Sequence, residues 1–230
     1  MEILELKRLA YEANMELHRR GLIIYTWGNV SQLDRARSLF AIKPSGVPYE
    51  ALTPEMMVLV DLELGKPVES RYKPSSDTPT HLVLYRAFSE IGGVTHTHSP
   101  AATAWAQARR AIPCYGTTHA DYFHGAVPVT RMLTGAEVEE AYEENTGRAI
   151  AEAFEGKNPM HAPAVLCAGH GPFTWGKDGA ESVHNAVVLE EVAKMAMWTE
   201  AVAPGAGALP AHVSDKHFLR KHGPNAYYGQ

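Results

Sequence analysis

The amino-acid sequence predicts one α/β domain that spans residues 1–230. Segments typical of strands and of helices alternate along the whole chain, which is the pattern of helices packed on a sheet. With 230 residues and 45% hydrophobic side chains, the chain can bury a sizeable core. No internal repeat, low-complexity tract or Ser/Gly linker divides it into smaller units.

The first part of the chain predicts one long helix followed by two short strands. Apolar residues recur at helical spacing over 3–20, and Gly21 is a suitable end for this helix. Strand-type runs follow at 39–42 and 57–62, and Pro or Gly closes each of them.

From residue 78 onward, helices and strands follow one another closely. A helix is expected over 78–91, with Pro79 in its first turn and Gly92-Gly93 at its end. The spacings between the strands suit both hairpins and crossovers, so they leave the strand direction open. The remaining elements are strands at 94–98 and 164–168 and helices at 101–108, 136–154, 180–202 and 214–221.

Composition excludes several classes of protein. The net charge of −5 and the pI near 6.2 offer no broad attraction for nucleic acid or for an anionic membrane. Cys114 and Cys167 are too few for a disulfide framework. The acidic N-terminus is unlike a signal peptide, and no window has the length and apolarity of a membrane span. We therefore expect a reduced, soluble, cytoplasmic protein.

The chain contains 12 histidines, and three of them sit at the ends of expected strands. His96 and His98 lie two residues apart, so in a strand both imidazoles can face one ion. His170 follows a second strand, and Asp77 stands at the mouth of a helix. Three imidazoles and one carboxylate suit zinc or a similar divalent ion. The alternatives are a chance His-x-His pair and an Asp77 that caps its helix.

Two turns begin with the same residues, Lys43-Pro44-Ser45-Gly46 and Lys73-Pro74-Ser75-Ser76. Each supplies a cation, a hydroxyl and free backbone N–H groups, which are the donors that a phosphate needs. The segment 27–31 is a third turn of small residues, with an amide side chain. Each Lys-Pro-Ser sequence alone is simply a good β-turn. Two copies, one of them beside Asp77, favour an anion-binding site.

Two other polar clusters allow more than one interpretation. His119 and Asp121 alternate before Gly125. They can act as further metal ligands, as an acid/base pair or as polar residues of a turn. The acidic run that contains Glu143 and Glu144 is most simply a solvated helix face. The segment 217–230 is rich in His, Arg and Tyr, so we expect it to dock, with a neighbouring subunit as one candidate.

Eight segments together closely resemble the class II aldolase/epimerase family. The likeness covers essentially the whole chain and is very specific. It favours the epimerases of the family, because the aldolases carry Glu at the position of Asp77 and lack the Thr-His-Ala-Asp segment. The segments are TWGNVS (26–31), KPSGV (43–47), KPSSDTPTH (73–81), HTHS (96–99), GTTHADYF (116–123), GHGPFTWG (169–176), HNAVVLEEVA (184–193) and DKHFLRKHG with AYYGQ (215–230).

The resemblance implies a role for each candidate residue. Zinc, or another divalent ion such as Mn²⁺ or Co²⁺, is the implied cofactor, and acid/base catalysis is assigned to Asp121 and Tyr228. Tyr228 is expected to reach the site from an adjacent subunit of a C4 homotetramer, at an interface that His217 and Arg220 would also line. The implied metal ligands are Asp77, His96, His98 and His170, in agreement with the spacing. The implied contacts to a sugar phosphate are Gly28, Asn29, Lys43, Ser45, Gly46, Ser75 and Ser76.

The same resemblance implies a fold and a reaction. The fold is a central, mainly antiparallel sheet flanked by helices on both sides. The reaction is inversion of carbon 4 of L-ribulose 5-phosphate to give D-xylulose 5-phosphate, by retro-aldol cleavage and re-addition through an enediolate. Arabinose catabolism is the expected setting.

Three rival functions remain at this point. An aldolase on the same scaffold would release the two fragments instead of recombining them. A non-catalytic, adducin-like interaction domain would have lost its ligands, and none is lost here. A zinc hydrolase would require a hydrolytic constellation such as a helical His-Glu-x-x-His, which the sequence lacks.

Overall fold

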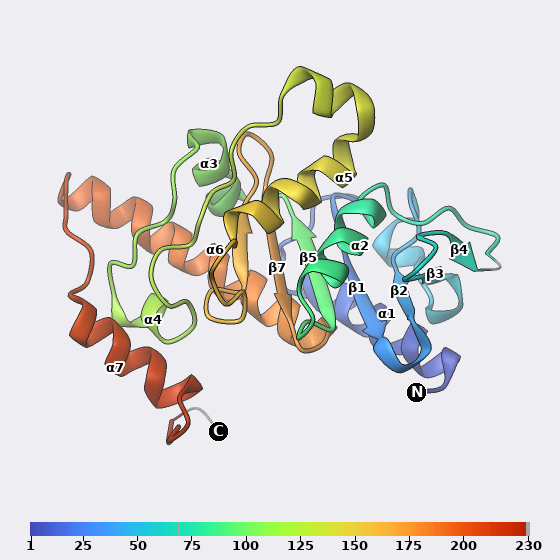
Figure 1. Cartoon of the computed structure of the whole chain (residues 1–230), viewed down its shortest axis with the longest axis horizontal. Helices are drawn as coiled ribbons and strands as arrows, with labels where there is room; N and C mark the ends of the chain where they lie inside the picture. Colours follow the sequence, from blue (N-terminus) through green and yellow to red (C-terminus); the bar gives the residue numbers. More distant parts are fainter. Residues whose placement is uncertain (69, 229–230) are drawn as a thin grey trace.

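The computed structural model describes residues 1–68 and 70–228, and one seven-stranded sheet runs through this part of the chain (Figure 1). The strand order is β4-β3-β2-β1-β5-β7-β6, and each neighbouring pair is antiparallel. The mainly antiparallel sheet implied by the resemblance is confirmed. The strands are β1 (Gly28–Asp34), β2 (Leu39–Ile42), β3 (Val58–Asp61), β4 (Pro67–Val68), β5 (Gly93–Thr97), β6 (Ala164–Leu166) and β7 (Pro172–Gly176).

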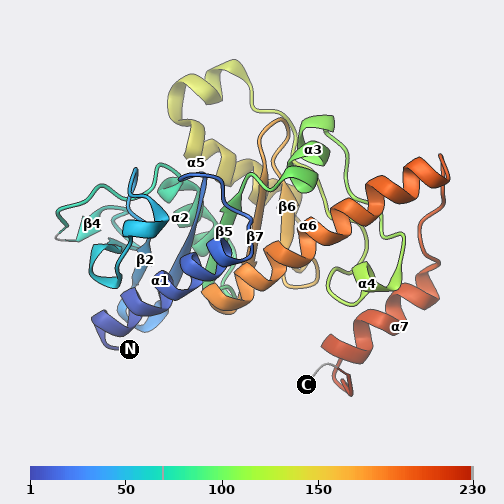
Figure 2. The same ribbon diagram turned by 180° about the vertical axis from the view of Figure 1, so that it is seen from behind.

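Helices cover both faces of the sheet. α2 (Thr78–Ala87) and α5 (Gly135–Ala153) pack on one face, and α1 (Ile3–Arg19) and α6 (Gly179–Val202) pack on the other (Figure 2). The other helices, α3 (Pro100–Ala108), α4 (Thr117–Ala120) and α7 (Ala211–His222), gather at the end of the molecule opposite β4 (Figure 1). Three 3₁₀ helices lie at Arg35–Arg37, Tyr49–Ala51 and Pro54–Met56.

Apolar side chains fill both layers between the sheet and the helices. On one face, Phe40 and Trp175 of the sheet pack in the same cluster as Ile150 of α5. On the other face, Val30 of β1 packs with Leu17 of α1. The sheet is therefore buried on both sides, and its polar side chains need internal partners.

The turn predicted at 27–31 is wrong, because residues 28–31 belong to the central strand β1. The reason is that β1 carries buried polar residues where a strand usually shows apolar ones. Ser31 forms hydrogen bonds with His81 Nδ1 and Tyr85 Oη, both at 2.7 Å. Gln32 accepts a hydrogen bond from the backbone N–H of Gly179 at 2.7 Å. These partners satisfy the strand internally, and nothing in the local pattern predicts them.

Other boundaries also differ from expectation. β7 was not predicted, because it is short and begins with Pro172. α2 ends at Ala87, four residues before the predicted end, because Phe88 adopts an extended backbone and packs its ring against Phe154 and Trp175. α7 begins at Ala211, three residues before the prediction. Within the described residues, no helix is both long and apolar enough to span a membrane.

A buried amide joins α1 to the central strand and supports a prediction about stability. Asn14 donates to the carbonyl of Val30 at 2.9 Å and accepts from the Val30 N–H, also at 2.9 Å. Replacing Asn14 with Ala leaves these backbone groups without their partner, at about 1–3 kcal/mol for each buried group. We expect a lower thermal midpoint for N14A in circular dichroism. The exposed E12A variant of the same helix, which loses only a surface ion pair with Arg8, should unfold close to wild type. A midpoint for N14A equal to that of E12A would contradict the assigned role.

Candidate metal centre and active site

Three imidazoles converge where β5 ends and where the turn between β6 and β7 passes beside it. His96 is on β5, His98 follows the strand, and His170 lies in the turn. Their ligand nitrogens all lie within 4.8 Å of one another, and His96 Nε2 is 3.1 Å from His98 Nε2. Two nitrogens bound to one tetrahedral zinc lie roughly 3.3 Å apart, given Zn–N distances of about 2.0–2.1 Å. The three side chains therefore fit a single ion.

The surroundings of the cluster keep these imidazoles available as ligands. His96 Nδ1 lies 2.9 Å from the carbonyl oxygen of Pro172. The His96 ring stacks on the Phe173 ring, with 4.2 Å between the ring centroids. The carbonyl accepts a hydrogen bond from Nδ1–H, which leaves the lone pair of Nε2 for a metal. Burial, together with the neighbouring imidazoles, lowers the pKa of His170 to about 4 and also lowers the pKa of His98. Both rings are therefore neutral at pH 7.

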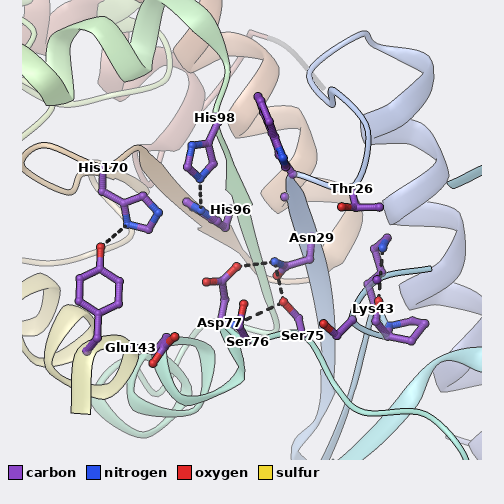
Figure 3. Close-up of a pocket in the computed structure, with 16 residues that line it drawn as sticks. Thr26, Asn29, Lys43, Ser75, Ser76, Asp77, His96, His98, Glu143 and His170 are labelled. Atoms are coloured by element: carbon purple, nitrogen blue, oxygen red, sulfur yellow. Dashed lines mark hydrogen bonds between the residues drawn. The ribbon is translucent and has the colours of Figure 1, made fainter. Parts of the chain in front are cut away.

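Asp77 lies beside the histidines and points its carboxylate toward them (Figure 3). It occupies the N-cap position of α2, yet its side chain makes no capping hydrogen bond. Instead, it accepts a hydrogen bond from Asn29 Nδ2 at 2.7 Å. Burial raises its pKa, but electrostatic interactions with His96 and His81 and the hydrogen bond from Asn29 outweigh burial and hold that pKa below its ordinary value. The geometry thus favours a site role for Asp77 over the capping alternative.

The two Lys-Pro-Ser turns lie side by side and form one wall of a cavity. The N–H of Ser45 donates to the carbonyl of Lys73 at 2.9 Å, and the N–H of Ser75 donates to the carbonyl of Lys43 at 3.0 Å. Asn29 Nδ2 also donates to the hydroxyl of Ser75 at 3.0 Å. The chain therefore brings together the two turns that the sequence analysis identified as similar, although about 30 residues separate them.

The cavity has a volume of about 550 Å³ and opens over the three-histidine cluster (Figure 3). Every residue predicted to bind metal or substrate lines it. These are Gly28, Asn29, Lys43, Ser45, Gly46, Ser75, Ser76, Asp77, His96, His98 and His170.

Lys43 places a positive charge in the cavity wall with little solvent around it. The residue is only 2% exposed, and its Nζ donates to the carbonyl of Val47 at 2.7 Å. No carboxylate pairs with it in the part of the chain that the structure describes, and burial lowers its pKa to about 8. A buried cation without a counter-ion is costly, so an anionic group beside Lys43 would be stabilised. The second cation, Lys73, is exposed and does not line the cavity.

Five residues of the cavity were not among the predicted metal ligands or substrate contacts: Thr26, Trp27, Pro44, Tyr142 and Glu143. Tyr142 and Glu143 come from α5, where Ala141 has non-helical angles of φ −162° and ψ 76°. This kink brings the Tyr142 hydroxyl to 3.4 Å from His170 Nδ1 and directs Glu143 toward the cavity (Figure 3). The interpretation of Glu143 as part of a solvated face was wrong. Nothing in the acidic run predicts the kink.

Asp121 and Tyr228 lie outside this cavity, at the α4–α7 end of the molecule. His119 and Asp121 do not share a face, because α4 is a turn of helix: His119 is buried with its Nε2 2.8 Å from the Gly125 carbonyl, whereas Asp121 faces α7. Asp121 accepts hydrogen bonds from Arg220 and from His217 Nδ1, and the Tyr228 ring lies against Arg220. Within this chain, the predicted acid/base groups therefore lie together and apart from the three histidines.

The charge state of Asp121 follows from these contacts. Partial burial raises its pKa, but the hydrogen bonds from Arg220 and His217 and the nearby positive charges outweigh burial. The pKa of Asp121 therefore lies below its ordinary value, and the carboxylate is ionised at neutral pH.

Comparisons with known proteins agree with this architecture. Residues 8–197 match the family described as class II aldolase and adducin N-terminal domain. Proteins named L-ribulose-5-phosphate 4-epimerase UlaF from Salmonella paratyphi A and Salmonella typhi are each 55% identical over 226 residues, covering 98% of this chain and 99% of theirs. A solved L-fuculose 1-phosphate aldolase superposes with a TM-score of 0.75 at 25% identity, over 93% of this chain and 94% of that one.

Proposed function

The chain belongs to the class II aldolase and adducin N-terminal domain family, and on this basis we propose that it epimerises carbon 4 of L-ribulose 5-phosphate to give D-xylulose 5-phosphate. The observation that carries the proposal is the cavity of about 550 Å³ that joins the three-histidine cluster to a buried lysine, which pairs with no carboxylate of the described residues. Near full-length identity of 55% to proteins named as this epimerase supports it. A pentulose-phosphate pathway in the cytoplasm, such as arabinose catabolism, is the proposed setting.

His96, His98, His170 and Asp77 are proposed to hold the divalent ion, with zinc as the preferred metal. Imidazole nitrogens and one carboxylate suit zinc, and they also bind Mn²⁺ and Co²⁺. When bound, the ion supplies positive charge that stabilises the negative charge developing as the substrate's carbon–carbon bond breaks. The intact ligand set also separates this chain from a non-catalytic, adducin-like domain.

The reaction cannot proceed by simple deprotonation, because the hydrogen on carbon 4 is not acidic. Breaking the bond between carbons 3 and 4 gives the enediolate of dihydroxyacetone and glycolaldehyde phosphate, after loss of the proton from the carbon 4 hydroxyl. The aldehyde then turns and presents its other face, and the same bond re-forms with inverted configuration. The phosphate must stay anchored meanwhile, which we assign to Ser45, Ser75 and Ser76, with Lys43 beside them.

Inversion requires one proton acceptor and one proton donor on opposite faces of the aldehyde. We propose Asp121 and Tyr228 for these roles. Because both lie outside the cavity of their own subunit and both contact Arg220, one neighbouring subunit would supply them together. A C4 homotetramer provides four equivalent head-to-tail interfaces of this kind.

The phosphate assignment predicts a large effect of the serine hydroxyls on affinity. Hydrogen bonds to charged groups contribute about 1.5–3 kcal/mol each, so S75A with S76A should raise KM about 100-fold or more. Metal content, measured by atomic absorption, should stay at the wild-type level. The matched control is S70A, on the exposed segment that precedes the second turn. An unchanged KM in the double variant would exclude these hydroxyls from substrate binding.

Product analysis tests the proposed activity. The metal-loaded protein is incubated with L-ribulose 5-phosphate, and the sugars are separated by chromatography. We expect D-xylulose 5-phosphate as the product, and the reverse reaction from D-xylulose 5-phosphate should reach the same mixture. Glycolaldehyde phosphate and dihydroxyacetone as main products would favour the aldolase instead.

A further inference from the structure

We propose that Arg220 is a positioning residue that joins the two acid/base groups, Asp121 and Tyr228, into one rigid unit. The proposal rests on the epimerase function above, and it concerns a residue that lies outside the cavity. Arg220 acts through its neighbours rather than on the substrate.

The Arg220 side chain holds Asp121 through two hydrogen bonds. Its Nε donates to Asp121 Oδ1 at 3.0 Å, and a terminal nitrogen donates to Oδ2 at 2.8 Å. The Asp121 side chain is only 13% exposed, so solvent competes weakly for these bonds. A bidentate guanidinium–carboxylate pair determines the orientation of the carboxylate as well as its position.

The same guanidinium also holds Tyr228. Its central carbon lies 4.1 Å from the centroid of the Tyr228 ring, which is the geometry of a cation–π contact. The Arg220 carbonyl accepts hydrogen bonds from the backbone N–H groups of Tyr227 at 2.9 Å and Tyr228 at 3.1 Å. Arg220 therefore contacts Tyr228 through both its side chain and its backbone. One residue determines the distance between the carboxylate and the phenol.

α7 has other anchors, so its attachment does not depend on Arg220 alone. Phe218 is 3% exposed and packs against the rings of His124 and His161. His124 Nε2 also lies 2.7 Å from a carboxylate oxygen of Asp215. Removing the guanidinium should consequently leave α7 in place and loosen only Asp121 and Tyr228.

Lysine should replace Arg220 only in part. An ammonium group keeps the positive charge near Asp121, but it cannot form the planar, two-bond fork or stack in the same way on the Tyr228 ring. Misplacing a catalytic group by about 1 Å can cost roughly 100-fold in rate. We therefore expect kcat to decrease in the order wild type, R220K, R220M.

The experiment compares R220M and R220K with the matched control R110M. Arg110 makes the same kind of contacts elsewhere, with two hydrogen bonds to Glu200 at 2.7 and 2.9 Å and its guanidinium 5.0 Å from the Trp105 ring. For R220M we expect a kcat about 100-fold below wild type, with KM within about twofold and unchanged metal content. R110M should keep a wild-type kcat. The tetrameric state of each variant is checked by size-exclusion chromatography.

Two further measurements distinguish positioning from general destabilisation. Loss of the Arg220 pair raises the pKa of Asp121, so the acidic limb of the kcat profile should move to higher pH in R220M and by less in R220K. Subunit mixing adds a second test: R220M mixed with H96N should regain activity, whereas R220M mixed with Y228F should not, because both lesions lie in the same unit.

The outcomes separate this inference from the proposed function. If wild type converts L-ribulose 5-phosphate and R220M has the same kcat as R110M, the positioning role of Arg220 is wrong and the epimerase assignment stands. Recovery of activity in the mixture of R220M and Y228F would also overturn the proposal that Arg220 and Tyr228 belong to one unit. If wild type itself does not convert the substrate, the proposed function fails, and this inference fails with it.

Discussion

Replacing His96 with Asn is expected to empty the metal centre and to lower kcat roughly 1,000-fold or more. His96 is 2% exposed, and its Nε2 lies 3.1 Å from that of His98, so its loss removes a ligand from the middle of the cluster. Charge stabilisation by a bound ion contributes several kcal/mol, and about 1.4 kcal/mol corresponds to a tenfold change in rate. D77N should act in the same direction, because an amide is a weaker ligand than a carboxylate. Metal per subunit and kcat are measured on the same preparations.

The control for this prediction is H212N, which changes an exposed histidine at the start of α7. This variant should retain wild-type metal content and kcat. Circular dichroism should show unchanged secondary structure in H96N and D77N, because neither residue belongs to the apolar clusters of the core. Stoichiometric metal in the H96N, D77N double variant would contradict the ligand assignment.

Subunit mixing should restore activity to a pair of inactive variants only when one variant lacks a metal ligand and the other lacks Asp121 or Tyr228. H96N removes a ligand from the three-histidine cluster. D121N and Y228F each remove one of the two proposed acid/base side chains that contact Arg220 of α7. Because Asp121 and Tyr228 lie together and apart from the cavity of their own subunit, H96N should complement either of the other two. D121N and Y228F should not complement each other.

The size of the recovery follows from the proposed cyclic arrangement of the subunits. A functional site needs one subunit with intact metal ligands and one neighbour with intact Asp121 and Tyr228. In a random equal mixture, each of these two conditions is met with a probability of one half. The expected activity is therefore about a quarter of wild type. Hybrid tetramers are verified by mass spectrometry with differently tagged subunits. Verified hybrids of H96N and Y228F without activity would mean that Tyr228 serves its own subunit or no site.

Short-range patterns predicted much of the site because its ligands come from strand ends and turns. The alternation of His96 and His98 in a strand placed both rings on one face, and the structure brings His170 to them. The similarity of the two Lys-Pro-Ser turns also proved informative, since they are joined by backbone hydrogen bonds. In each case, two or three residues carry the signal and no long-range packing is needed to detect it.

Features that depend on tertiary contacts could not be predicted in the same way. β1 carries Asn29 and Ser31, whose polar side chains find partners on the distant helix α2 and its N-terminal turn. The kink at Ala141 that turns Glu143 toward the cavity has no Pro or Gly at that position to mark it. The contact of Asp121 with Arg220 joins residues 99 positions apart. Only the assembled fold shows that Asp121 and Tyr228 lie apart from the three histidines.

The most direct test of the central claim, inversion by breaking and re-forming the bond between carbons 3 and 4, is proton NMR of the reaction in deuterium oxide. The metal-loaded protein is mixed with L-ribulose 5-phosphate, and the signal of the carbon 4 hydrogen is followed in substrate and product. Retro-aldol chemistry predicts that D-xylulose 5-phosphate accumulates with this hydrogen fully retained, because the carbon–hydrogen bond is never broken. Deuterium at carbon 4 of the product would contradict the proposed chemistry, and an unchanged substrate spectrum would contradict the proposed activity.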